Sequence, residues 1–113
     1  MRESDRERRR KHQIARNEAL FREVNESVRE VSGGGPTEMT EFLCECGDEA
    51  CTETIELQNE EYEHVRADPL LFVIMRGHEI AEVEDLVARY ERFDIVRKHE
   101  TESVIARQTD PRS

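Results

Sequence analysis

The sequence has no tryptophan, and only 5% of its 113 residues are aromatic. Hydrophobic residues make up 35% and charged residues 39%, so little apolar surface is available to offset the conformational entropy lost on folding. The longest apolar run, residues 70–75, is far shorter than the roughly 18 residues that span a bilayer, and we expect no membrane partner. The length fits one small domain, and its core needs a further source of stability.

Cysteine is also scarce. The chain has three cysteines, an odd number, and no apolar N-terminal segment that resembles a signal peptide. A secreted framework of disulfides is therefore not expected. The sequence favours a cytoplasmic protein whose thiols stay reduced.

Positive charge is lacking over most of the chain. The net charge is −10, but residues 1–16 hold seven basic and three acidic side chains, a net of +4, and residues 17–113 hold a net of −14. The acidic body should repel nucleic acid, so a nucleic-acid partner is not expected there. The basic N-terminus could contact a phosphate backbone or an acidic protein, or it could be the solvated end of a helix.

The three cysteines that are present lie within eight residues. Cys44, Cys46 and Cys51 flank a turn that contains Gly47 and Asp48. Zn²⁺ is held by thiolate and imidazole ligands in a tetrahedron, and a turn of this kind can point three sulfurs at one centre. The spacing therefore predicts a zinc site with one position left for a fourth ligand.

The fourth ligand is predicted to be His78, which follows a glycine at the end of the most apolar segment. From there its side chain can turn back over a neighbouring metal loop. Glu79 could hold the second nitrogen of the imidazole ring, and water or Glu53 remains an alternative fourth ligand. The other histidines fall at solvated positions: His12, His64 and His99.

Residues 5–31 contain no glycine or proline and predict a long helix with a seam like that of a coiled coil. The seam could fold back on its own domain or pair with a second copy of the chain as a homodimer. Its candidate partner-binding residues are Ile14, Phe21, Val24 and Val28, with Val31 continuing the pattern.

The predicted fold class is α+β: a long N-terminal helix followed by a small zinc-stabilised domain with a short antiparallel sheet and one or two helices. The expected parts are a helical arm (1–31), a Gly-rich linker (32–40), a zinc-binding α+β domain (41–108) and a tail (109–113). Within the domain we expect a strand at 52–57, a helix capped by Asn59 and ended by 67–69, a strand at 70–75 and a final helix at 102–107. Residues 81–98 are ambiguous because 83–90 match helical spacing, but a hairpin that turns near Glu91 and Arg92 is favoured.

The segment Cys-x-Cys-Gly-x-x-x-Cys resembles the zinc turn of post-SET segments in histone lysine methyltransferases, although the chain has no room for the catalytic domain. More of the chain resembles a family of small, uncharacterised zinc-binding proteins that is commonest in actinobacteria. The matching stretches are 16–26, 42–48, 61–69 and Gly77-His78-Glu79. That family typically has proline where this chain has Arg76. The resemblance implies a bacterial zinc-binding module without an established activity.

The function that these patterns favour is a structural-zinc module for protein interaction or regulation, without catalysis. A regulator associated with transcription and nucleic acid, which would use the basic N-terminus, is the alternative. A zinc enzyme is less favoured, because the deaminase and His-Glu-x-x-His patterns are missing. Redox sensing by the thiolates is compatible with the first function.

Overall fold

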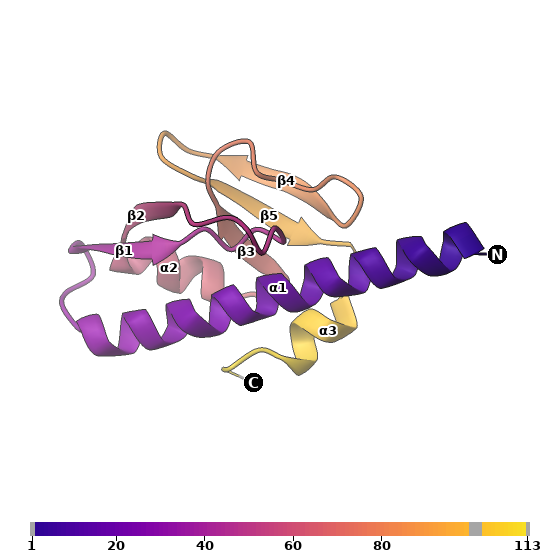
Figure 1. Ribbon diagram of the computed structural model, residues 1–113. Coiled ribbons are helices and arrows are strands. Elements are labelled where there is room, and N and C mark those ends of the chain that lie inside the picture. The colour runs from indigo at the N-terminus through magenta and orange to yellow at the C-terminus, as the bar shows by residue number, and fades with distance from the viewer. Residues whose placement is uncertain (1, 100–102, 113) are drawn as a thin grey trace.

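The computed structural model describes residues 2–99 and 103–112, and within them it contains three helices and five strands (Figure 1). In chain order these are α1 (Arg2–Ser32), β1 (Met39–Leu43), β2 (Thr54–Gln58), α2 (Asn59–Arg66), β3 (Leu71–Ile74), β4 (Glu84–Arg89), β5 (Asp94–Lys98) and α3 (Ser103–Gln108). The predicted α+β class, with its long N-terminal helix, is confirmed. Residues 1, 102 and 113, which end three of the predicted segments, lie outside the described residues.

The strands form two small antiparallel sheets. β1 pairs with β2, with Phe42 opposite Ile55. The other sheet has the order β3-β5-β4, with Val73 opposite Ile95. The hairpin favoured for residues 81–98 is confirmed, because β4 and β5 are adjacent antiparallel strands joined across Tyr90 to Phe93.

Alternating residues of β3 and β5 contribute to two apolar clusters. The first joins Val73 and Ile95 to the β1-β2 sheet and α2, and the rings of Phe42 and Tyr62 stack in it with centroids 4.2 Å apart. The second joins Phe72, Ile74 and Val96 to α3 and to two of the cysteines. Its remaining buried members are Cys44, Cys46, Leu70 and Ala106. The cysteine loop thus begins inside the protein's core.

The start of α2 differs from the prediction. Asn59 is the first helical residue, and Gln58 occupies the N-cap position that was predicted for Asn59. The Asn59 side chain instead donates to the carbonyl oxygens of Gly33 (3.1 Å) and Gly35 (2.9 Å). It fastens the glycine-rich segment to the domain, which is why it is not available as a cap.

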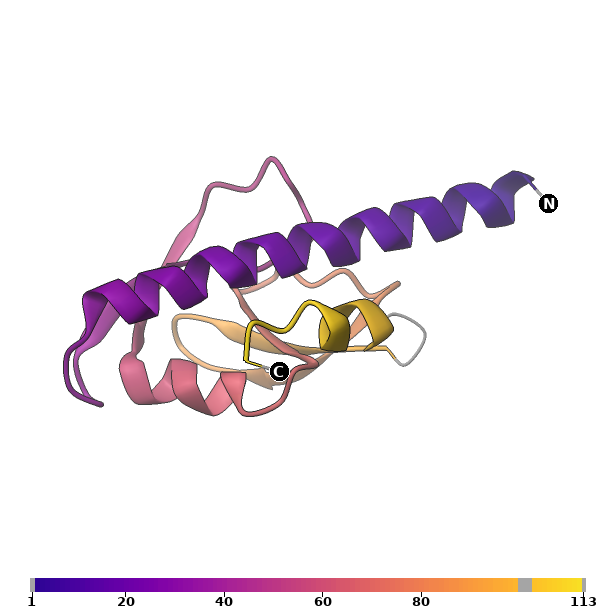
Figure 2. The same cartoon turned by 90° about the horizontal axis from the view of Figure 1, so that it is seen from below.

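Helix α1 runs lengthwise along the other elements, and its N-terminal turns project beyond them (Figure 1 and Figure 2). The side of α1 that faces them is half polar, since Glu18, Arg22 and Asn25 are fully buried beside the apolar Ile14, Ala15 and Ala19. The structure therefore shows the helix packed on its own chain, one of the two arrangements that the sequence left open. Among the described residues, no helix combines the length and the apolar character needed to cross a membrane.

Candidate metal centre

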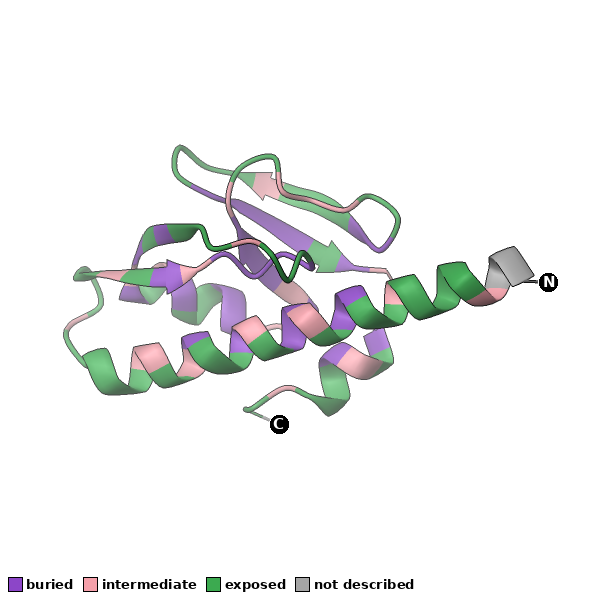
Figure 3. Ribbon diagram, in the orientation of Figure 1, coloured by how far each residue is buried: buried purple, intermediate pink, exposed green. Residues whose placement is uncertain are grey.

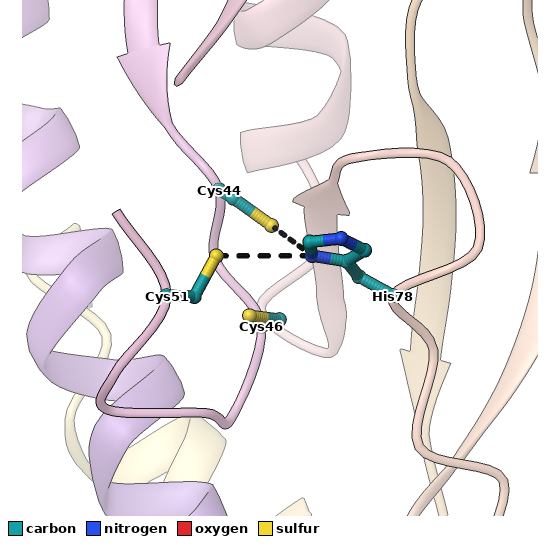
Figure 4. A group of neighbouring side chains, drawn as sticks. All are labelled: Cys44, Cys46, Cys51 and His78. Carbon is teal, nitrogen blue, oxygen red and sulfur yellow. Dashed lines mark hydrogen bonds between the residues drawn. The ribbon is translucent and has the colours of Figure 1, made fainter. Parts of the chain in front are cut away.

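Four side chains from two loops meet at one point (Figure 4). Cys44, Cys46 and Cys51 lie in the loop between β1 and β2, and His78 lies in the turn that follows β3. The cysteine loop is anchored at its base, because Cys44 N donates to Glu53 O at 3.0 Å. The structure thus brings together the four residues predicted as metal ligands.

The spacing of the four donors fits one tetrahedral ion. The Nδ1 atom of His78 lies 3.5 Å from the sulfur of Cys44 and 3.7 Å from that of Cys51. All four donor atoms lie within 4.8 Å of one another. Zinc bonds of about 2.3 Å to sulfur and about 2.05 Å to nitrogen, at tetrahedral angles, place sulfur and nitrogen about 3.6 Å apart. A cation of this size can therefore be held with little movement of the loops.

The surroundings of the sulfurs favour one thiolate, that of Cys46. The backbone N–H of Met75 donates to the sulfur of Cys44 at 3.1 Å. A hydrogen bond with the Cys44 thiol lowers the pKa of Cys46 to about 5, with help from the backbone N–H of Asp48 and from His78. The same hydrogen bond, together with burial, raises the pKa of Cys44, which keeps its proton. Binding a cation would release that proton, because metal-bound cysteine is a thiolate.

Helix α1 supports the metal loop from one side. The side-chain amide of Asn17 donates to Gly47 O at 2.8 Å. Gly47 packs so closely on the helix that a Cβ atom there would lie 2.2 Å from Cγ2 of Ile14. Only glycine fits at this contact, so the position of the loop depends on where the helix lies.

Glu45, between two of the cysteines, ties the loop to both α1 and β3. It is fully buried, and its carboxylate accepts from the side chain of Asn25 (2.8 Å) and from Val73 N (3.1 Å). Asn25 also exchanges two hydrogen bonds with the backbone of Leu43, at 2.8 and 2.9 Å. Burial raises the pKa of Glu45 to about 7, although the Asn25 hydrogen bond opposes the shift. These polar contacts hold the loop in place without any help from the metal.

The remaining sequence candidates lie elsewhere. His12 and His64 are exposed, and His99 lies 3.1 Å from Asp85. Glu79 pairs with Arg89 at 3.9 Å, and among the described residues no hydrogen bond joins it to His78. Of the proposed partner-binding residues, Ile14 is buried, Phe21 is half-buried, Val28 packs against the first apolar cluster, and Val24 is exposed.

An open cavity of ≈ 430 Å³ borders the cluster on the side of Cys46 and His78. Arg10 and Asp48 also line it, and Arg10 forms an ion pair with Glu82 at 2.5 Å. Solvent and small chelators can therefore approach the cluster from this side, although Cys44 and Cys46 are each only 2% exposed.

No family model matches the chain, and neither curated proteins nor solved structures give a match. The case for a metal centre therefore depends on the geometry of Cys44, Cys46, Cys51 and His78. Sequence reasoning missed Asn25 and Glu45 as supports of the loop. The one available signal was the position of Glu45 between two ligand cysteines, where a side chain is held close to the metal.

Proposed function

We propose that the chain is a small protein-interaction module whose fold is stabilised by one structural Zn²⁺ and which carries out no catalysis. The observation that carries the proposal is the closed set of four donors, three sulfurs and one imidazole nitrogen within 4.8 Å. Four such ligands saturate zinc and leave no position for a reactive water. A structural zinc ion contributes on the order of 10 kcal/mol in small metal-dependent folds.

The polar supports of the loop agree with a structural role. Asn17 and Asn25 on α1, and Val73 on β3, bind the backbone or the side chain of the cysteine loop. A metal at this point would connect the β1-β2 loop to the turn after β3, and because the loop is hydrogen-bonded to α1, it would stabilise the whole chain and not the loop alone. We also propose that the chain is related to the small actinobacterial zinc proteins, because it carries the Cys-x-Cys-Gly-x-x-x-Cys and Gly-His-Glu motifs. This relationship is consistent with the proposed function.

The test is the zinc content and the thermal stability of the wild type beside two histidine variants. We expect one zinc per wild-type chain, full occupancy in the control His64→Ala, whose side chain is exposed, and a large loss in His78→Ala. Removing zinc from the wild type should lower its melting temperature and release protons. A zinc-free wild type that melts cooperatively at an unchanged temperature would overturn the proposal.

The same variants separate structural zinc from catalytic zinc. If His78→Ala kept its zinc, water or another group would complete the tetrahedron, and the site would be open. Cobalt substitution reports this directly, because its absorption changes when a nitrogen ligand is replaced by water.

A further inference from the structure

The side of α1 that faces away from the protein carries an exposed apolar patch. Leu20 is 56% exposed, Val24 39% and Val31 87%, and all three lie on the solvent side of the helix. Figure 3 shows that exposed residues run along this helix and cover most of its N-terminal part. Ile14 and Val28, by contrast, face the protein's own core. The exposed patch thus keeps Val24 and Val31 from the apolar seam recognised in the sequence and adds Leu20, whereas Ile14 and Val28 of that seam pack inward.

Four charged residues border the patch along one edge. Arg9, Arg16, Glu23 and Glu30 follow one another at intervals of seven residues, so they lie in one row along the helix. All four are exposed. No ion pair engages any of them within residues 2–99 and 103–112. The row is basic in its N-terminal half and acidic in its C-terminal half.

This row is complementary to itself when two copies run in opposite directions. A two-fold axis placed between residues 19 and 20 sets Arg16 opposite Glu23 of the second copy, and the same axis sets Arg9 opposite Glu30. Each pair occurs twice, because a two-fold interface uses the same surface on both copies. A parallel arrangement would instead bring arginine beside arginine and glutamate beside glutamate, which disfavours it.

Of the three apolar residues, Leu20 agrees with the same axis. Leu20 lies next to it, so the two Leu20 side chains would meet at the centre of the contact. The body of each chain lies on the far side of its helix, which keeps the two bodies apart. A groove of ≈ 390 Å³ between α1 and α3, lined in part by Arg16, Leu20, Glu23 and Ile105, adds surface beside the patch.

We propose that α1 binds a second copy of this chain, antiparallel across a two-fold axis at Leu20, with Arg9 and Arg16 paired to Glu30 and Glu23 of that copy. The proposal supplies a partner for the interaction module and in that sense rests on the proposed function. The contact needs no metal of its own.

The test is the mass of the zinc-loaded, full-length chain by sedimentation equilibrium, from low micromolar to near-millimolar concentration. We expect a monomer–dimer equilibrium in the wild type. Leu20→Glu should weaken dimerisation about tenfold or more, because two charges would meet at the centre of the interface. The matched control is Val87→Glu on β4, where the valine is 50% exposed but away from α1, and it should leave the dissociation constant unchanged.

Charge reversal tests the direction and the register. Arg16→Glu and Glu23→Arg should each weaken the dimer, since each places like charges opposite one another. The double variant carrying both changes should recover wild-type affinity, because the pair is restored with its signs exchanged. A wild type that stays monomeric at every concentration, or a double variant no better than the single ones, would overturn the proposal.

Zinc analysis of the same samples keeps the two proposals apart. A monomer that holds one zinc would refute the dimer and leave the structural zinc in place. A zinc-free chain that still dimerises would do the reverse. Circular dichroism on each variant checks that the loss of dimer is not a loss of fold.

Discussion

Gly47 shows how strongly one residue can couple the metal loop to the rest of the chain. Its backbone carbonyl is bound by Asn17, and the space for a side chain is filled by Ile14. The absence of a side chain at Gly47 therefore has two effects: it allows the loop to bend, and it allows the loop to contact α1. A glycine in a turn on the surface would only need to allow the chain to bend.

We expect Gly47→Ala to destabilise the protein by about 1–3 kcal/mol, because the added methyl group forces the loop and the helix apart. Urea unfolding of the zinc-loaded chain measures this. Gly35→Ala is the matched control, since nothing lies within 4 Å of a Cβ atom there, and it should be close to neutral.

A double-variant cycle identifies the cause. In an Ile14→Ala background the clashing Cγ2 atom is absent, so Gly47→Ala should cost clearly less than it does in the wild type. An unchanged cost in that background would mean that the alanine acts through the turn and not through the helix.

The ligand residues could be predicted from the sequence, but their supports could not. Three cysteines within eight residues and a histidine after Gly77 form a pattern that is typical of a metal site. Asn25 and Glu45 carry no such pattern, because a buried amide and a buried carboxylate become recognisable only when their partners, Leu43 and Val73, are placed beside them. The sequence contains 27 acidic residues, and apart from the position of Glu45 between two cysteines nothing local distinguishes the buried ones.

At the scale of elements, α1 is held to the β4-β5 hairpin by a buried group of charges. Lys98 on β5 pairs with Glu18 on α1, and it lies 3.6 Å from Glu84 on β4. Burial raises the pKa of Glu18 well above its ordinary value, and the neighbouring Glu84 adds to the shift, whereas Lys98 opposes it. Two buried carboxyl groups therefore lie beside one lysine, and burial disfavours the ionised form of Glu18.

The raised pKa of Glu18 gives α1 a pH-dependent contribution to stability. Above about pH 4.3 the unfolded chain ionises Glu18 while the folded chain keeps it protonated, so the folded state loses relative stability as the pH rises. We expect Glu18→Gln to remove that loss. The free energy of unfolding of the variant, relative to wild type, should rise between about pH 5 and about pH 8.

Urea unfolding at both pH values, with zinc at saturation, measures the difference. Glu41→Gln on β1 is the control, since Glu41 is exposed, and it should track the wild type. A Glu18→Gln curve parallel to the wild type at all pH values would show that Glu18 does not keep its proton in the folded chain.

The helices and strands were predictable where the sequence carries a simple local pattern. Leu71–Ile74 is almost entirely buried and was evident as an apolar run, and the long helix was evident from its lack of glycine and proline. β1 was not predicted as a strand, because Phe42 is the only buried residue among its five and no alternation is visible. The inward side of α1 could not be predicted either, since the buried residues Glu18, Arg22 and Asn25 do not match an apolar stripe.

For the whole molecule, the helix supplies bonds that no other element replaces. Arg22 is fully buried, donates to the carbonyl oxygens of Pro69 (2.6 Å) and Ala106 (2.7 Å), and lies over the ring of Phe72. Without α1 these carbonyl groups and the backbone of Leu43 lose their partners. Unpaired buried polar groups cost about 1–3 kcal/mol each.

We therefore expect a fragment of residues 36–113 to be unfolded even with zinc present, as judged by circular dichroism and amide dispersion. The control fragment, residues 12–113, removes the first turns of α1, in which residues 6–10 are exposed, together with the surface pairs Arg8–Asp5 and Arg10–Glu82, and it should remain folded. A folded 36–113 fragment would instead support the division into a separable arm and a domain that the sequence predicts.

The buried charges of α1 also govern when the protein can finish folding during its synthesis. Glu18 and Lys98 are 80 positions apart, and Arg22 reaches a carbonyl group 84 positions away. During synthesis α1 emerges before β5 and α3, so Glu18 and Arg22 lack these late partners, whereas Asn17 and Asn25 find theirs within residues 43–47. The nascent chain should therefore expose Glu18 and part of Arg22 to water until β5 and α3 are made, and we expect docking of α1 to be completed only then.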